Sequence, residues 1–111
     1  MKLHSKRLLA IAQAIAQYKQ GTILADIGTD HAYLPCFLYD QGVIEKAYAC
    51  DVAKGPLASS KQTIMTHHME DQIIPLLGNG LDPIVDKDVD MISICGMGGM
   101  LMLEILDAHK E

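Results

Sequence analysis

A chain of 111 residues has room for one small domain, and because half of its residues are hydrophobic it can form a core. No stretch approaches the roughly 18 consecutive apolar residues of a membrane helix, and the N-terminus lacks a secretory pattern. Residues 1–20 hold four cations and no acid, whereas the remaining five cations and 14 acidic residues sum to −9, a balance that argues against a broad basic nucleic-acid-binding face.

The apolar periodicity predicts helices and strands in alternation. In chain order we expect helix 6–18, strand 22–27, helix 33–41, strand 46–52, helix 55–68, strand 73–77, strand 90–95 and a last helix over 101–106. Ser5 is a candidate cap for the first helix, and Pro75 interrupts the third strand. Such alternation favours parallel strands joined by right-handed crossovers, hence a three-layer α/β sheet with flanking helices.

Three cysteines, Cys36, Cys50 and Cys95, are odd in number and far apart. This spacing matches neither a disulfide framework nor a zinc knuckle, so we expect buried, reduced thiols in a cytoplasmic protein. The sequential pair His67-His68 would point to different sides of a helix, which indicates surface residues. We therefore expect no metal site and no contact with a membrane.

Each predicted strand ends on glycines or on a carboxylate. The four strand ends are Asp26-Ile27-Gly28-Thr29-Asp30, Asp51, Gly78-Asn79-Gly80 and Gly96-Met97-Gly98-Gly99. In an open parallel sheet, ligands bind outside the carboxyl ends of the strands. The order of these breaks therefore predicts one shared crevice.

The turn after the first strand decides between classes of cofactor. Gly28 allows a tight backbone turn and close approach of a ligand. Asp30 and Tyr33 occupy the other glycine positions of a dinucleotide fingerprint, and no Gly-Lys-Ser/Thr follows for a phosphate loop. Carboxylates at Asp26 and Asp30 would repel a pyrophosphate but attract an amino group and a sulfonium, which favours S-adenosylmethionine over NAD or ATP. An ordinary strand-to-helix connection is the alternative.

Two further positions fit the rest of such a cofactor. Asp51 lies 23 positions beyond Gly28, near the spacing of about 20 residues expected of a carboxylate that binds ribose hydroxyls. An acid at a helix N-terminus is the competing interpretation. Asn79 can accept from an exocyclic amine and donate to a ring nitrogen, as adenine recognition requires. A plain Asn-Gly turn is the alternative there.

The fourth break, residues 96–99, exposes backbone at the mouth of the predicted crevice. Its glycines would admit a flat substrate close to the methyl donor, and Met97 would lie against a base. We predict that Gly96, Met97 and Gly98 shape the catalytic pocket. Lys6 and Arg7 are candidates for RNA phosphate contacts, although cations that merely solvate a surface helix explain the same charge.

Four segments together resemble the bacterial tRNA (adenine(22)-N1)-methyltransferase family. They are Ser5-Lys6-Arg7-Leu8, the run from Ala25 to Pro35 (ADIGTDHAYLP), Gly78-Asn79-Gly80-Leu81 and Gly96-Met97-Gly98-Gly99. The resemblance implies a Rossmann-like class I methyltransferase fold that binds S-adenosylmethionine and methylates N1 of an adenine in tRNA. By position it implies these cofactor-binding residues: Asp26, Gly28, Thr29, Asp30, His31, Asp51, Val52, Asn79, Gly80, Leu81 and Gly96.

The chain departs from this family in two residues and in length. The family favours glutamate where Asp51 stands and aspartate where Asn79 stands. Its further strands and C-terminal helical domain have no counterpart in the 111 residues. We therefore expect residues 1–111 to be the N-terminal cofactor-binding portion, ending after the fourth strand and its helix, with residues 1–20 as a basic helix. Exposed sheet edges would favour self-association.

Adenine N1 is already unprotonated at neutral pH, so we expect catalysis by positioning and no general base. The adenine must be unpaired or turned out of its stack. Two other hypotheses remain: a non-catalytic fragment that binds S-adenosylmethionine or a partner subunit, and a methyltransferase that acts on another substrate. The tRNA hypothesis further predicts weak or absent turnover by 111 residues alone.

Overall fold

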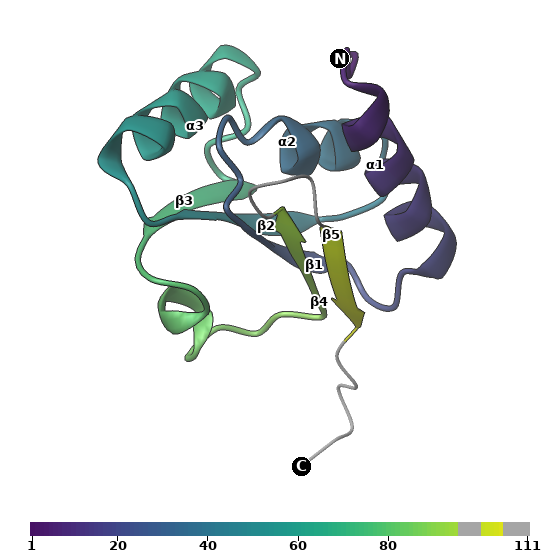
Figure 1. The fold of residues 1–111 in the computed structure, drawn as a ribbon. Coiled ribbons are helices and arrows are strands. Elements are labelled where there is room, and N and C mark those ends of the chain that lie inside the picture. Colours follow the sequence, from purple (N-terminus) through teal and green to yellow (C-terminus); the bar gives the residue numbers. More distant parts are fainter. Residues whose placement is uncertain (96–100, 106–111) are drawn as a thin grey trace.

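The structure is a computed structural model that describes residues 1–95 and 101–105. Its elements alternate as the sequence predicts for most of the chain (Figure 1). They are α1 (Lys6–Tyr18), β1 (Ile23–Ile27), α2 (Tyr33–Asp40), β2 (Lys46–Asp51), α3 (Lys54–Thr66), β3 (Ile73–Leu77), the short 3-10 helix η1 (Asp82–Ile84), β4 (Met91–Cys95) and β5 (Leu101–Ile105). None of the described helices is long and apolar enough to span a bilayer.

The strands form one sheet in the order β3-β2-β1-β4-β5. The first four are parallel: Asp26 of β1 lies beside Ala49 of β2 and Ser93 of β4. The chain moves outward from β1 to β3 and then returns to the other side of β1 to form β4. The strand order therefore reverses at β1, and the crevice between β1 and β4 is where such folds bind ligands.

The direction of each crossover decides which face of the sheet it covers. The connections from β1 to β2 and from β2 to β3 run the same way, so right-handedness places α2 and α3 on one face, where α1 joins them (Figure 1). The connection from β3 to β4 runs the opposite way and carries η1 to the other face, where Ile84 belongs to the same buried apolar cluster as Tyr48 and Ile92. The predicted third layer consists of η1 alone within the described residues.

Local chemistry explains the helix ends and an unusual strand residue. The Ser5 side chain accepts a hydrogen bond from the Leu8 N–H at 3.2 Å and caps α1, as predicted. Pro35 lies in the first turn of α2, where a missing N–H costs little. Pro75 lies in β3, an edge strand, where a residue without an N–H is tolerated.

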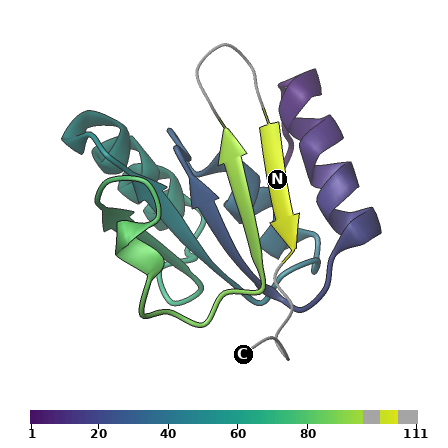
Figure 2. The same cartoon turned by 60° about the horizontal axis from the view of Figure 1, so that its bottom comes forward.

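The prediction of a helix over 101–106 is wrong. Leu101–Ile105 form β5, which pairs antiparallel with β4 so that Cys95 lies beside Leu101 and Met91 beside Ile105; Figure 2 shows the two strands side by side. Only five residues separate them, which suits a hairpin and not the dozen or more that a parallel crossover needs. The pairing also provides hydrogen-bond partners for the backbone N–H and C=O groups on the outer side of β4. The apolar periodicity of the sequence does not reveal this tertiary contribution.

Candidate functional site

The turn that follows β1 holds an unusual backbone. Gly28 has φ +71°, and the non-glycine residues Asp30 and Ala32 adopt φ +66° and +59°. The N–H groups of Gly28 and Thr29 both donate to the Cys50 carbonyl, at 2.9 and 3.1 Å, which fixes the turn to the end of β2. Left-handed conformations at residues other than glycine are disfavoured and persist only where surrounding contacts impose them.

Asp26 is the buried carboxylate of the site, with 1% of its surface exposed. Its Oδ2 accepts a hydrogen bond from the Thr29 hydroxyl at 2.8 Å, and its Oδ1 accepts one from the Ser93 hydroxyl at 2.7 Å. Thr29 belongs to the turn and Ser93 to the middle of β4, so the carboxylate joins the two strands at which the strand order reverses. Hydroxyl donors hold a buried carboxylate in one orientation and lower the cost of burying it.

Asp30 is held through its backbone on both sides. Its N–H donates to Oδ2 of Asp51 at 2.9 Å, and its carbonyl accepts from the Ser60 hydroxyl on α3 at 2.9 Å. Ser60 is fully buried. These two bonds, made by residues 21 and 30 positions away, hold the strained left-handed residue in place. Its carboxylate remains exposed and lies 3.5 Å from the imidazole of His31.

Asp51 lines two cavities at the carboxyl ends of the strands. One has a volume of about 690 Å³ and the other about 130 Å³, and Gly28, Asp51 and Val52 line both. The Asp51 Oδ1 accepts from the Val52 N–H at 3.1 Å, while Oδ2 accepts from Asp30. The alternative of a capping acid is not supported, because α3 has Ala53 at its N-cap and no side-chain cap.

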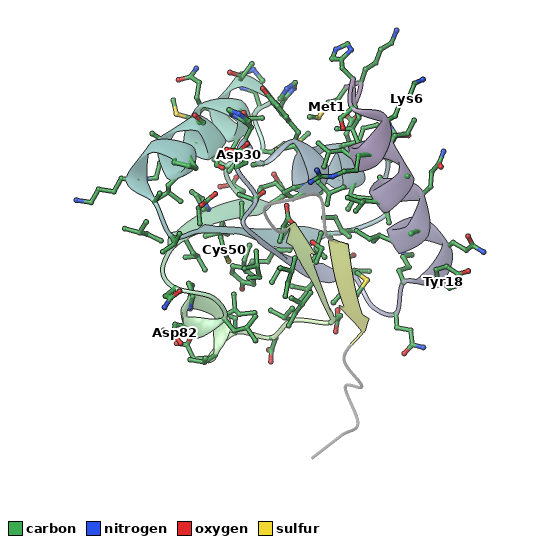
Figure 3. The ribbon with its side chains drawn as sticks, in the orientation of Figure 1. Met1, Lys6, Tyr18, Asp30, Cys50 and Asp82 are labelled. Carbon is green, nitrogen blue, oxygen red and sulfur yellow. The ribbon has the colours of Figure 1, made fainter. Side chains whose placement is uncertain are left out.

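The larger cavity extends from β1 and β2 to the beginning of α1 and α2. Asp30, labelled in Figure 3, lies on the connection between β1 and α2. Its lining consists of Ser5, Arg7, Leu8, Asp26, Gly28, Thr29, Asp30, His31, Tyr33, Leu34, Asp51, Val52 and Pro56. The ring of His31 stacks on that of Tyr33, with centroids 5.1 Å apart and an interplanar angle of 22°. Three carboxylates in one cavity of this size favour a ligand that carries positive charge.

The smaller cavity is formed by the ends of β1 and β2 and the loop after β3. Ile27, Cys50, Gly78, Asn79 and Gly80 complete its lining. A Cβ on Gly78 would lie 2.4 Å from Cγ of Pro83, so only glycine allows this approach. Asn79 is exposed, and its carbonyl accepts from the Asp82 N–H at 3.0 Å. The Asn-Gly turn is therefore present, and the same turn presents Asn79 to the cavity.

The two cysteines whose surroundings are described are buried thiols, as predicted. Burial raises the pKa of Cys36 to about 12. The pKa of Cys50 is also raised to about 12, by burial and by the negative charges of Asp26 and Asp51. Both thiols are therefore protonated at neutral pH and poor nucleophiles. Cys50 contributes to the cavity as a small apolar wall.

The structure brings together most of the predicted site residues. Asp26, Gly28, Thr29, Asp30 and His31 line the larger cavity and Asn79 and Gly80 the smaller one. Leu81 is 46% exposed and lines neither cavity. Arg7 lines the larger cavity but Lys6 does not, although both were expected at RNA. Gly96, Met97, Gly98 and Gly99 lie outside the described residues. Among the described residues no His, Cys, Asp and Glu group suits a metal ion.

Sequence reasoning missed the two serines that hold the turn. Ser93 is the one polar residue in the apolar run Met91 to Cys95 and is fully buried. A hydroxyl inside a buried strand signals a buried acceptor, so Ser93 could have been found. Ser60 offers no such signal, because it lies in a helix beside Ser59 and only the tertiary structure distinguishes the two.

The site can be tested against the cofactor that the sequence favours. A buried, oriented carboxylate at Asp26 suits an ammonium group, Asp51 suits a diol, and the loop at Asn79 suits a flat hydrogen-bonding base. Asp26 lines the larger cavity, Asn79 the smaller one, and Asp51 both. No phosphate-binding cation lies in the turn itself. The residues present therefore fit S-adenosylmethionine and do not fit a pyrophosphate cofactor.

Comparison with known proteins agrees with this geometry. The methyltransferase domain family matches residues 4–111. The chain belongs to this family. It is 38% identical over 107 residues to a tRNA (adenine(22)-N(1))-methyltransferase of Bacillus subtilis, an alignment that covers 96% of this chain and 44% of that protein. A putative tRNA methyltransferase of Mycoplasma pneumoniae is 28% identical over 106 residues, covering 96% of this chain and 49% of that protein.

Solved structures extend the comparison to the fold. A putative tRNA (m1A22) methyltransferase of Streptococcus pneumoniae, in complex with S-adenosyl-L-methionine, matches with a TM-score of 0.78 and 40% identity, over 86% of this chain and 44% of that one. TrmK of M. capricolum, in complex with S-adenosyl-homocysteine, matches with a TM-score of 0.76 and 36% identity, over 86% and 42%. The Rossmann-like methyltransferase fold is thereby confirmed. The chain spans less than half the length of these relatives.

Proposed function

We propose that this chain binds S-adenosylmethionine and forms the cofactor-binding part of a methyltransferase that acts on N1 of an adenine in tRNA. The observation that carries the proposal is the arrangement of Asp26, Asp51 and Asn79 around two cavities that share Gly28 and Asp51. The similarity to proteins named as tRNA (adenine(22)-N(1))-methyltransferases supports the choice of substrate. The cofactor supplies an electrophilic methyl group.

In this proposal Asp26 receives the ammonium group of the methionine part. Its two oxygens already accept from Thr29 and Ser93, and each carboxylate oxygen can accept more than one hydrogen bond. The exposed carboxylate of Asp30, beside His31, adds negative charge on the same side of the cavity. This charge attracts the sulfonium as well as the ammonium.

Asp51 receives the ribose hydroxyls. Each of its oxygens accepts one backbone N–H, from Asp30 and from Val52, so the carboxylate is oriented before a ligand arrives. Preorganised acceptors of this kind lose little side-chain entropy on binding. These two bonds fix the orientation of the aspartate that stands where the resembling family favours glutamate. Asn79 and Gly80, which line the smaller cavity, receive the adenine, and Leu81, the next residue, remains our prediction for a further cofactor contact.

On the substrate side, the proposal needs alignment and not proton transfer. N1 of an unpaired adenine carries a lone pair at neutral pH, so the chain must hold the base in line with the methyl group and exclude water. Gly96, Met97 and Gly98 remain our prediction for the pocket of that base, and Lys6 for an RNA phosphate contact. A cytoplasmic location follows from a tRNA substrate.

Two measurements test the proposal in order. Titration calorimetry with S-adenosylhomocysteine should show one binding site, and the absence of heat from a folded chain would refute the cofactor assignment. Labelled S-adenosylmethionine with unmodified tRNA then tests the reaction, with tRNA in which the target adenine is replaced as the control. Because the chain spans less than half of its relatives, we expect weak transfer. Binding without any transfer would favour the non-catalytic alternative.

A further inference from the structure

Arg7 and Lys6 are adjacent cations that the sequence does not distinguish, but they differ in their positions relative to the cavities. Arg7 lines the 690 Å³ cavity, whereas Lys6 lines none of the described cavities. Figure 3 places Lys6 at the start of α1. The cap at Ser5 fixes this first turn of the helix, and Ser5 and Leu8 line the same cavity as Arg7. The beginning of α1 therefore forms part of the wall of this cavity, and the exposed side chain of Arg7 lines it.

The charges of the cavity are unbalanced without a ligand. Among the described residues that line it, Asp26, Asp30 and Asp51 are acidic and Arg7 is the one permanently charged cation. Arg7 makes no ion pair or side-chain hydrogen bond with any other residue in the described part of the chain. A guanidinium that shares a cavity with three carboxylates and pairs with none of them keeps its five donors available for a ligand.

The location of Arg7 in its helix points the same way. The first turn of α1 has two cations and no acid, and a cation near a helix N-terminus is unfavourable because that end of the helix dipole is positive. A local rule broken at a cavity is typical of a functional residue. A ligand carboxylate at this place would be attracted by both the guanidinium and the helix end.

We propose that Arg7 binds the α-carboxylate of the methionine part of the cofactor. The inference rests on the proposed function and adds a residue to it. S-adenosylmethionine is a zwitterion at its amino-acid end. Asp26 and Asp30 attract its ammonium group but repel its carboxylate. Arg7 supplies the complementary charge on the same cavity, and its planar fork matches a carboxylate with two parallel hydrogen bonds.

The competing role for Arg7 is the RNA phosphate contact that the sequence suggests. The two roles differ in the ligand group that they need. S-adenosyl-3-thiopropylamine has the adenosine, sulfur and ammonium of S-adenosylhomocysteine but lacks the carboxylate. If Arg7 binds the carboxylate, removal of the Arg7 side chain should weaken the binding of S-adenosylhomocysteine. It should not weaken the binding of S-adenosyl-3-thiopropylamine.

The experiment is calorimetry of the 111-residue chain and three variants with both ligands. We expect Arg7→Ala to weaken S-adenosylhomocysteine binding about 10- to 100-fold, the loss typical of a charged hydrogen bond. The affinity of Arg7→Ala for S-adenosyl-3-thiopropylamine should stay within about twofold of that of the original chain, as expected for groups that do not interact. Arg7→Lys should lose less. Lys61→Ala, a control that removes an exposed cation lining none of the described cavities, should change neither affinity. Circular dichroism checks that each variant is folded.

The outcomes separate this inference from the proposed function. Equal affinity of the original chain and Arg7→Ala for S-adenosylhomocysteine overturns the inference alone, as does an equal loss for both ligands. No binding of S-adenosylhomocysteine by the original chain overturns the proposed function and the inference with it. Filter binding with tRNA identifies the alternative: a loss of tRNA affinity in Arg7→Ala, with cofactor affinity unchanged, assigns Arg7 to a phosphate.

Discussion

The turn at residues 26–32 and the loop at residues 78–81 lie at the two ends of the proposed cofactor site and are built differently. The turn contains a buried carboxylate and three left-handed residues, and it is tied to α3, β2 and β4. The loop is largely exposed and is tied to the sheet by the Gly78 N–H, which donates to the Asp51 carbonyl at 2.9 Å.

This difference indicates how the two ends recognise a ligand. Charged groups need fixed, partly dehydrated partners, because a misplaced or flexible carboxylate would be screened by water. The end of the site around Asp26 provides such partners at the cost of backbone strain. A flat base needs shape and a few neutral hydrogen bonds, which an exposed loop at Asn79 can supply. Most of the binding free energy should therefore depend on the turn, and three substitutions test this.

The largest effect is expected for Asp26→Asn. The substitution removes the buried negative charge but keeps the size of the side chain, so S-adenosylhomocysteine binding should weaken about 100-fold, corresponding to the upper range for a charged hydrogen bond. Calorimetry measures the affinity. Asp71→Asn, which neutralises an exposed carboxylate that lines neither cavity, should have no effect. Equal affinities of the two variants would contradict the central role of the turn.

An intermediate effect is expected for Ser60→Ala. It removes the donor to the Asp30 carbonyl, so the left-handed turn loses one of its two supports and the free energy of unfolding should fall by about 1–3 kcal/mol. Cofactor affinity should fall about tenfold, and exchange of the Asp30 amide should become faster. Urea unfolding, calorimetry and hydrogen exchange measure these changes.

Ser59→Ala is the matched control for Ser60, one residue away in the same helix, because its hydroxyl makes no hydrogen bond to the turn among the described residues. If both variants lost the same stability, helix propensity would explain the result and the support of Asp30 by Ser60 would be refuted.

The smallest effect is expected for Asn79→Ala. Asn79 is exposed and offers neutral hydrogen bonds, so affinity should fall about threefold, within the range for a neutral hydrogen bond. Stability should not change, because the turn carbonyl that accepts from Asp82 belongs to the backbone. A loss as large as that of Asp26→Asn would show that the adenine end, and not the turn, dominates binding.

Sequence reasoning found the elements well wherever a local signal marks them. Helix α1 and strand β3 begin and end where the apolar pattern predicts, and the glycines and carboxylates at the strand ends identify the cavity. It failed at β5, because an apolar segment of five residues fits a helix or a strand and only the open edge of β4 decides between them.

By itself, the sequence determined the strand–helix alternation, the ligand-binding end of the sheet and the carboxylates that disfavour a phosphate cofactor. These follow from hydrophobic periodicity and from charge, which act locally. Only the tertiary structure decided which serines hold the turn, that Arg7 lines the larger cavity while Lys6 does not, and that Asp51 lines both cavities. The physical reason is that a hydrogen bond between Asp26 and Ser93 joins residues 67 positions apart, and such partners are chosen by sheet register and helix packing.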